Sequence, residues 1–324
     1  MTLRTNISNE DYHSSEELSR SKASALLASS PAHVKHSIDN PVPSTPALLM
    51  GGCFHTAVLE PMKLEYEYGE KPTEIDGKGP LTNVYKQGMI ELENSYPERR
   101  WLKSSDYNTC LEMASACLEH PVVSQYLAEA DAIIEGTGYF NYEDAECKVR
   151  PDYFLPGADV VIDLKSTQDA SPKGFAKSVR KFGYDFQACW YMEGLRRMGY
   201  SPKEFIFVAV EKSAPYATAC YTLSASDIAR HREPMRRACK IWAECVSSGV
   251  WPSYGDSVQT LELNNDFKRL SLQDLARKFN VGRHFVYKIV QSYQLETRTV
   301  GNKRTVDIND FAEALRWNAE EKAA

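Results

Sequence analysis

The sequence lacks any apolar run of the roughly 18 residues that a membrane-spanning helix needs, so it predicts no membrane partner. Its N-terminal residues 1–20 are polar and acidic, without the apolar centre of a signal peptide. Paired cysteines are missing too, because its eight cysteines stand singly, without a C-x-x-C pair. This usage argues against a disulfide scaffold or a four-cysteine cluster and indicates free thiols in the cytoplasm.

Basic residues are in the minority, since 38 Lys and Arg oppose 44 Asp and Glu for a net charge of −6. A protein with this balance binds nucleic acid only where cations gather locally, because each phosphate contact is made by a nearby Lys or Arg. One such group lies on a predicted helix that begins near Ser171. Its members are Lys173, Lys177, Arg180 and Lys181. The alternative is an ordinary solvated helix face.

The length of 324 residues suggests two domains, and 43% hydrophobic with 25% charged residues is ordinary globular composition. Hydrophobic periodicity predicts an α/β core with a helical N-terminal portion. The predicted helices cover residues 15–29, 46–60, 81–94, 104–128, 171–181, 185–198 and 224–247. The predicted strands cover residues 133–142, 146–155, 159–166, 204–211 and 216–223, and residues 65–80 predict a loop.

Asp152, Asp163 and Lys165 form the pattern with the clearest chemistry. Residues 160–166 predict a buried strand, in which Asp163 and Lys165 share a face because they are two residues apart. Cys147 to Leu155 predicts the antiparallel partner strand, which brings Asp152 near Asp163. Two carboxylates and a lysine in a small volume suit a divalent-metal site that hydrolyses phosphodiesters. The alternative is an exposed ion pair worth under about 1 kcal/mol.

The same residues carry a family resemblance. Pro151-Asp152 followed by Asp163-x-Lys165 resembles the PD-(D/E)xK nuclease pattern, although Asp163 is shorter than the Glu that the pattern also allows. Gln187 and the tyrosine four residues later match the Q-x-x-x-Y helix motif of the RecB-like branch. The resemblance implies a restriction-endonuclease-like (PD-(D/E)xK) core.

Motifs upstream narrow the resemblance. Gly51-Gly52-Cys53-Phe54-His55 matches the G-x-x-x-H motif of exodeoxyribonuclease VIII (RecE-like) and related phage exonucleases. Residues 19–22 and 29–33 resemble the opening helix of the same family. All of these motifs follow in the family's order, between about residue 6 and about residue 250.

The resemblance implies a role for each matching residue. His55, Asp152 and Asp163 would be ligands of Mg²⁺, for which Mn²⁺ would substitute, with the Leu164 carbonyl as a further ligand. Lys165 would be the catalytic lysine, acting with the carboxylates.

Three further site residues are implied. Glu135 stands where related nucleases carry an additional catalytic acid. Its close competitors are Glu143, Asp144 and Glu146. Gln187 and Tyr191 are four residues apart on one helix face, so they could contact the DNA backbone or support the site.

The pattern breaks around residues 251–267, and a second unit follows. The boundaries that we expect are a nuclease domain at 1–256, a linker at 257–269 and a second domain at 270–324. Ser271 and Asp274 resemble a capping box at the start of a helix. Helices are predicted at 271–279, 283–293 and 309–319, with a hairpin of 295–300 and 303–308 about a type II′ turn at Gly301-Asn302. This layout resembles small winged helix-turn-helix domains of the excisionase and MerR-like group.

Residues 277–304 contain seven basic residues and one acid, a net charge of 7 − 1 = +6. In such domains the second helix enters the major groove of DNA. The groove-facing candidates are Arg283, His284, Tyr287 and Lys288. The candidates that flank the wing are Arg298, Lys303 and Arg304. The alternative is a module that docks on another protein.

The resemblance implies a Mg²⁺-dependent deoxyribonuclease, most specifically an exonuclease that resects linear double-stranded DNA from 5′ to 3′ in phage-type recombination. It also implies a homo-oligomer, a single-strand annealing protein as partner, and the cytoplasm of a bacterial or phage-infected cell. Two alternatives stay open. One is a structure-specific or single-strand DNA endonuclease in defence or repair, and the other is a non-catalytic DNA-binding regulator.

Overall fold

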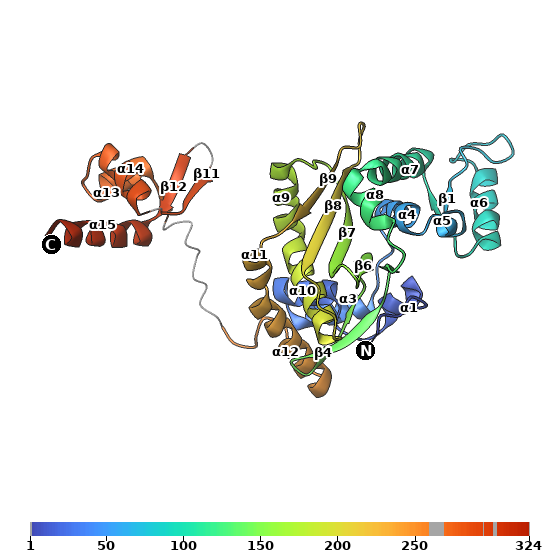
Figure 1. Cartoon of the computed structure of the whole chain (residues 1–324), viewed down its shortest axis with the longest axis horizontal. Helices are drawn as coiled ribbons and strands as arrows, with labels where there is room; N and C mark the ends of the chain where they lie inside the picture. Colours follow the sequence, from blue (N-terminus) through green and yellow to red (C-terminus); the bar gives the residue numbers. More distant parts are fainter. Residues whose placement is uncertain (1, 259–268, 294, 301–302, 324) are drawn as a thin grey trace. The chain divides into compact units, whose positions relative to one another are not determined.

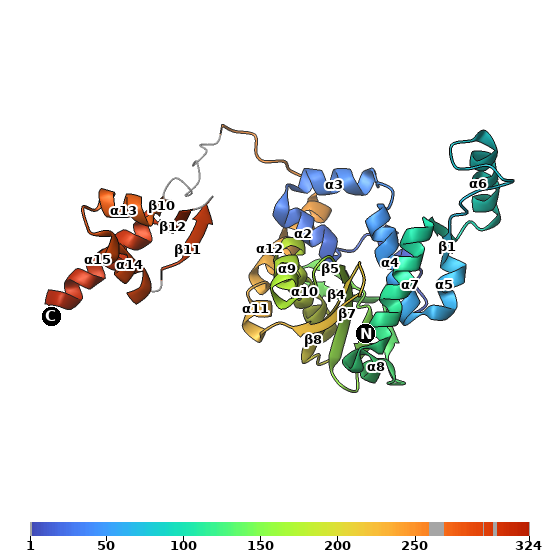
Figure 2. The same cartoon turned by 90° about the horizontal axis from the view of Figure 1, so that it is seen from above.

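Figure 1 shows the computed structural model of the chain, and Figure 2 shows it from above. The structure describes residues 2–258, 269–293, 295–300 and 303–323. The chain divides into two compact units, Met1–Gly255 and Asp256–Ala324, and each is described by itself. No helix among the described residues is both long and apolar enough to cross a membrane.

The first unit is built on a five-stranded sheet in the order β3-β6-β7-β8-β9. β7 and β8 pair in parallel, whereas the other neighbours are antiparallel. Side chains of the two central strands alternate between the faces, so that Val161 and Phe207 join one apolar cluster while Ile162 and Val208 join another. The strands are β3 (Ile133–Ile134), β6 (Tyr153–Leu155), β7 (Val160–Thr167), β8 (Glu204–Glu211) and β9 (Thr218–Thr222).

Helices cover both faces of this sheet (Figure 1). On the Val161 face, α9 and α10 contribute Phe175 and Leu195 to the core. On the opposite face, α4 and α7 contribute Phe54 and Met113. Both faces of the central strands are therefore buried, which explains their continuous apolar runs. The helices are α4 (Pro46–Leu59), α7 (Ser104–Glu119), α8 (Pro121–Leu127), α9 (Pro172–Phe182) and α10 (Tyr184–Arg197).

A third apolar cluster lies between α10 and a two-stranded hairpin, and helices from both ends of the unit contribute to it. Its centre is Trp190, which is fully buried and donates its indole N–H to the Lys148 carbonyl at 3.0 Å. Phe140 of the hairpin and Trp242 of α12 belong to the same cluster. The elements around it are α1 (Asn9–Ser14), α2 (Arg20–Ala28), α3 (Pro31–Asp39), β4 (Gly138–Tyr142), β5 (Ala145–Val149), α11 (Ala225–Ala229) and α12 (Arg232–Ser248).

One segment projects from the first unit in both figures. It comprises α5 (Pro61–Glu67), β1 (Tyr68–Glu70), α6 (Asn83–Ser95) and β2 (Arg100–Leu102). Tyr68 anchors it, because its hydroxyl accepts a 2.9 Å hydrogen bond from Arg100 and packs directly over Gly52 of α4. A Cβ at Gly52 would collide with that hydroxyl, so the close approach requires glycine at this position.

Two predicted strands are wrong in extent. The predicted strand 133–142 is divided into β3 and β4, because Glu135 adopts the left-handed conformation with φ 48° and turns the chain. The predicted strand 146–155 is divided into β5 and β6 by Pro151, which has no N–H to donate to a ladder. The partner of β7 is therefore only Tyr153–Leu155, not the whole run from Cys147.

Some predicted helices are also divided. The helix predicted at 104–128 ends at Glu119 because Pro121 begins a new one, and the helix predicted at 224–247 forms α11 and α12. Of the helix predicted at 15–29 only α2 (Arg20–Ala28) forms, and the predicted loop 65–80 contains the end of α5 and β1. Predictions for 46–60, 81–94, 159–166, 171–181, 185–198, 204–211 and 216–223 are confirmed to within two residues at each end.

The described part of the second unit has a short strand, a helix, a turn, a second helix, two further strands and a last helix. Ser271 caps the first helix by accepting from the Asp274 N–H at 3.1 Å, as the sequence predicts. The strands form a sheet in the order β10-β12-β11 over a core that includes Leu275, Val286 and Phe311. The predicted turn at Gly301-Asn302 and most of the predicted linker lie outside the described residues. The elements are β10 (Arg269–Ser271), α13 (Leu272–Lys278), α14 (Arg283–Ser292), β11 (Thr297–Val300), β12 (Lys303–Asp307) and α15 (Ile308–Ala323).

Candidate metal centre at the edge of β7

The candidate site lies where β7 continues beyond its short neighbour β6. The ladder between the two strands ends at the pair Tyr153 and Ile162. Just past it, the side chain of Asp152 replaces a backbone partner, because its Oδ2 accepts the Leu164 N–H at 2.8 Å. Because the chain before β6 is interrupted at Pro151, the Asp152 carboxylate pairs with the edge of β7 where a backbone carbonyl would otherwise do so.

Three possible ligands meet at this edge. His55 of α4, Glu135 and Asp152 offer ligand atoms that all lie within 4.8 Å of one another. The His55 Nδ1 is 3.3 Å from the Asp152 Oδ2, and the Glu135 N–H donates to the Asp152 carbonyl at 3.1 Å. Glu135 reaches the cluster from a left-handed backbone conformation, which costs a non-glycine residue roughly 1 kcal/mol or more. Strain of this kind is often found at functional sites.

Asp163 and Lys165 lie beside this cluster on one face of β7. Asp163 is fully buried, accepts a 2.5 Å hydrogen bond from the Gln187 side-chain amide and forms an ion pair with Lys165. The Lys165 Nζ also lies 4.8 Å from the centre of the Tyr184 ring. Asp163 is therefore held by neighbours on two sides and lies outside the three-residue group.

The electrostatics of the site are those of crowded carboxylates with limited access to water. Burial, and then the charge of Asp152, raise the pKa of Glu135 to about 8. Burial also raises the pKa of Asp163 to about 6, although the ammonium of Lys165 opposes this change. Burial and the charge of Lys165 lower the pKa of His55 to about 4, so that its imidazole is neutral at pH 7.

These residues fit a divalent cation. Two carboxylates provide the hard oxygen ligands that Mg²⁺ and Mn²⁺ prefer, and a neutral imidazole can add a nitrogen. A bound cation would also compensate the repulsion that raises the pKa of Glu135. The residues that would hold the cation are Asp152, Glu135 and His55, and the ligand role predicted for Asp163 stays a prediction.

Tyr191 lies one helical turn after Gln187 and is half-buried between two apolar clusters. Its ring centre is 6.3 Å from that of Phe205, and burial raises the pKa of Tyr191 well above the usual value. The structure thus places the Gln187 amide against Asp163. Tyr191 instead packs against the two apolar clusters.

The predicted basic group on α9 does not meet the cluster. Its side chains are all exposed, and the only aromatic contact described for them joins Lys181 to Phe182, at 5.1 Å. The members are Lys173, Lys177, Arg180 and Lys181. The helix that carries them follows β7 directly in the chain.

The sequence analysis missed several residues that hold the site together. Arg150 is buried and donates to the Thr137 hydroxyl at 2.8 Å and the Ile7 carbonyl at 3.0 Å. Lys148 is buried too and donates to the Ser15 carbonyl at 3.0 Å. These cations attach the N-terminal segment to β5. The sequence signal that could have found these cations is the alternation of Glu146, Lys148 and Arg150 along the strand.

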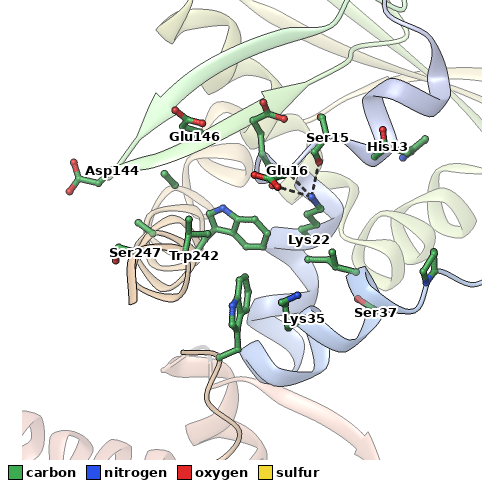
Figure 3. A pocket seen from close by; sticks show the side chains of 18 of the residues that line it. His13, Ser15, Glu16, Lys22, Lys35, Ser37, Asp144, Glu146, Trp242 and Ser247 are labelled. Atoms are coloured by element: carbon green, nitrogen blue, oxygen red, sulfur yellow. Dashed lines mark hydrogen bonds between the residues drawn. The ribbon is translucent and has the colours of Figure 1, made fainter. Parts of the chain in front are cut away.

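A cavity of about 1310 Å³ lies elsewhere, between the N-terminal helices and α12 (Figure 3). Its lining includes Trp242, over whose ring Lys22 lies at 5.3 Å. Carboxylates outnumber cations on its wall, and they include Glu16, Asp144 and Glu146. The charge of this cavity disfavours the binding of phosphates.

In the second unit, the four groove-facing candidates are exposed on α14, while Val286, Ile289 and Val290 of the same helix are buried. Those four are Arg283, His284, Tyr287 and Lys288. The Arg283 guanidinium lies 6.0 Å from the Tyr287 ring centre. Among the wing candidates, Lys303 is exposed, Arg298 pairs with Glu296 at 3.0 Å, and Arg304 donates to the Thr297 hydroxyl at 3.0 Å.

A known crystal structure shares this fold. A crystal structure of a proposed exonuclease from Eubacterium rectale matches with a TM-score of 0.57 and 14% sequence identity, over 82% of this chain and 97% of that one. A phage-related exonuclease from Haemophilus somnus 129PT matches with a TM-score of 0.31 and 15% identity, over 61% of this chain and 95% of that one. At such identities only the first match is informative, and it concerns the fold. No curated protein matches the chain.

A family model covers most of the first unit. Residues 19–264 match the family described as a PDDEXK-like domain of unknown function (DUF3799), and α13 to α15 lie outside the match. The expected α/β core of the restriction-endonuclease-like type is thereby confirmed, together with the resemblance of the chain to PD-(D/E)xK nucleases. The roles of Asp152, Asp163 and Lys165 stay predictions. The chain belongs to this PDDEXK-like family.

Proposed function

We propose that this protein is a divalent-metal-dependent deoxyribonuclease, and most specifically an exonuclease that shortens linear double-stranded DNA. The observation that carries the proposal is the convergence of His55, Glu135 and Asp152 beside the pair Asp163 and Lys165. Ligands for a cation and a held ammonium in one small volume are what phosphodiester hydrolysis needs. The family and the fold support this proposal.

Each residue has a separate task in the proposed reaction. A cation at the three-residue group would supply Lewis-acid chemistry, acidifying a water and neutralising charge on the phosphate. The Lys165 Nζ donates hydrogen bonds to the attacking water or to a phosphate oxygen. Asp163 orients that ammonium, and Gln187 in turn orients Asp163 through their 2.5 Å hydrogen bond.

The finer features of the proposal come from the resemblance to exodeoxyribonuclease VIII. They are 5′ to 3′ polarity, a ring-shaped homo-oligomer, and delivery of the remaining strand to an annealing protein in phage-type recombination. The proposed exonuclease of the same fold is consistent with the requirement for a DNA end.

We also propose that the second unit is a winged helix-turn-helix that binds DNA through α14. The separation of four polar side chains from a buried apolar stripe on this helix supports the proposal. The excess of basic residues over 277–304 supplies the charge that phosphate contacts require.

The experiment that tests the nuclease uses linear duplex DNA labelled separately at each 5′ and 3′ end, beside closed circular DNA. The purified protein is incubated with Mg²⁺ or with a chelator. Stepwise loss of label from the 5′ ends, with the circles intact and no reaction in chelator, is the expected result. Protein carrying Lys165→Ala is run in parallel to detect contaminating nucleases, with Lys240→Ala on the surface of α12 as the matched control.

Other outcomes would change the assignment. Nicked or linearised circles would make the protein an endonuclease. Loss of label from the 3′ ends first would reverse the polarity. If no DNA substrate is cleaved with any divalent cation, the enzyme proposal fails and a DNA-binding regulator takes its place.

For the second unit, Lys288→Ala in the full chain is expected to weaken DNA binding about three- to tenfold in the absence of divalent cation. The slope of log affinity against log salt should fall by about 1, because one phosphate contact is lost. Fluorescence anisotropy of a labelled duplex measures both quantities. Lys240→Ala removes an equally exposed charge from α12 and should change neither. Equal affinity and slope in Lys288→Ala would argue against the assigned face.

A further inference from the structure

We propose that Tyr184 is a positioning residue for Lys165, and that Arg20 of α2 holds Tyr184 in place. The inference rests on the proposed function, because it assigns two further residues to the support of the same site. Neither side chain touches the three possible metal ligands in any contact that the structure describes.

The ammonium of Lys165 is confined between two groups. Asp163 forms an ion pair with it on one side, and the face of the Tyr184 ring lies 4.8 Å from Nζ on the other. The lysine side chain is only 14% exposed, so water competes little with either contact. A cation over an aromatic face is attracted by the negative charge density of the ring, and more strongly where water is excluded. Without the ring, a flexible four-carbon chain would be held by the carboxylate alone.

The Tyr184 ring is itself held by other aromatic rings. Its centre lies 5.7 Å from Phe182, 6.0 Å from Phe207 and 6.1 Å from Phe175, with interplanar angles of about 30°. Phe207 and Phe175 are buried in the sheet–helix core. The ring therefore presents one fixed face to Lys165.

Arg20 fixes the backbone that carries this ring. Its Nη2 donates to the Phe182 carbonyl at 2.6 Å and the Gly183 carbonyl at 2.7 Å, across more than 160 residues of sequence. Gly183 is left-handed, with φ 64°, and forms the joint at which α9 ends and α10 begins with Tyr184. The last carbonyls of a helix lack partners in the helix, and a guanidinium is a strong donor to them. Loss of Arg20 would free this joint and with it the orientation of Tyr184.

The contacts that position Lys165 involve the Tyr184 ring and not its hydroxyl. No hydrogen bond is described for the Tyr184 hydroxyl in the part of the chain that the structure covers, whereas its ring makes four contacts. Phenylalanine keeps the ring face and leucine removes it. The two substitutions therefore separate positioning by the ring from hydrogen bonding by the hydroxyl.

The test compares kcat and KM for cleavage of a short linear duplex in Mg²⁺. Tyr184→Leu should lower kcat about tenfold with KM unchanged, while Tyr184→Phe stays within about twofold of wild type. Arg20→Ala should lower kcat about fivefold, and the double variant should be no slower than Tyr184→Leu alone, because both act through one ring. Arg236→Ala, an exposed arginine paired with Glu233 on α12, is the matched control.

A second measurement does not depend on cleavage. A double-mutant cycle of unfolding by denaturant, with Lys165→Met and Tyr184→Leu, should show a coupling factor of at least about threefold in the unfolding equilibrium constant. Coupling below this, Tyr184→Phe as slow as Tyr184→Leu, or multiplicative losses with Arg20→Ala would each overturn the inference. A wild-type protein that cleaves nothing but shows the coupling would instead refute the proposed function and leave the positioning contact established.

Discussion

Asp152→Asn is expected to lower the rate of DNA cleavage by about 10³-fold or more. The change removes the carboxylate whose Oδ2 lies 3.3 Å from the His55 Nδ1 and accepts the Leu164 N–H of β7 at 2.8 Å. Asparagine binds a divalent cation much more weakly than a carboxylate does. A loss of about 4 kcal/mol of transition-state stabilisation corresponds to that factor. Initial rates on end-labelled linear duplex in saturating Mg²⁺ measure it.

The same variant should keep the fold. The asparagine side-chain oxygen can still accept the 2.8 Å hydrogen bond from the Leu164 N–H. Removal of a charge from the buried cluster also relieves the repulsion that, after burial, raises the pKa of Glu135. The metal-free variant should therefore be at least as stable as the metal-free wild type. Mg²⁺ at 100 times its dissociation constant should stabilise the wild type by about 2.7 kcal/mol and the variant by much less.

The control is Asp159→Asn, at the turn before β7, where the aspartate is half-buried and pairs with the exposed Lys203 at 2.9 Å. The control makes the same chemical change seven residues further along the chain. The Asp159 backbone is left-handed, with φ 59°, a conformation that asparagine tolerates. Cleavage by Asp152→Asn within tenfold of the control, or equal stabilisation of both variants by Mg²⁺, would show that Asp152 does not hold the ion.

The parts of the site that sequence predicts are those set by local periodicity. Asp163 and Lys165 share a face because strand residues two apart always do, and the predicted strand 159–166 is displaced by only one residue. Gln187 lies on a helix predicted to within one residue at each end, which places its amide towards the sheet. Ser271 caps its helix as expected, because a cap involves only the next three residues.

The parts that sequence did not predict depend on interruptions and on distant partners. Hydrophobic runs continue through Glu135 and Pro151, so the periodicity shows two long strands where the backbone turns. Those turns place Glu135 and Asp152 at the cluster. Arg20 meets the Gly183 carbonyl across more than 160 residues, and no local pattern marks such a contact. Spatial neighbours of this kind become visible only with the tertiary structure.

Titration of Glu135 is expected to lower the unfolding free energy of the metal-free protein by about 1.6 kcal/mol between pH 6.5 and pH 8. Folding raises the pKa of Glu135 from 4.5 to about 8, so in this range the folded carboxyl holds a proton that the unfolded one has lost. Stability then falls as pH rises, by at most about 1.4 kcal/mol for each pH unit. Denaturant unfolding in chelator at several pH values measures the slope.

Other groups at the site act below this window. The pKa of His55 falls from 6.5 to about 4 on folding, so its contribution increases stability with pH, but only up to about pH 6.5. The pKa of Asp163 rises only to about 6, so its contribution is complete by then. Burial also lowers the pKa of Lys148 to about 8, so its titration increases stability with pH in the same range. The contribution of Glu135 is therefore the difference in slope between the wild type and Glu135→Gln. Glu135→Gln should flatten the fall in stability with pH, since the amide does not titrate.

Saturating Mg²⁺ should also flatten the slope, because a bound cation favours the ionised carboxylate and lowers the pKa of Glu135 towards its usual value. The informative comparison is whether Glu135→Gln and saturating Mg²⁺ both flatten the dependence of stability on pH. Flattening by Glu135→Gln alone would show a buried acid that takes no part in metal binding. Flattening by both would link the strained Glu135 backbone to the ion, and would explain why the fold retains a left-handed glutamate at that turn. A slope that persists in Glu135→Gln would mean that another group titrates there.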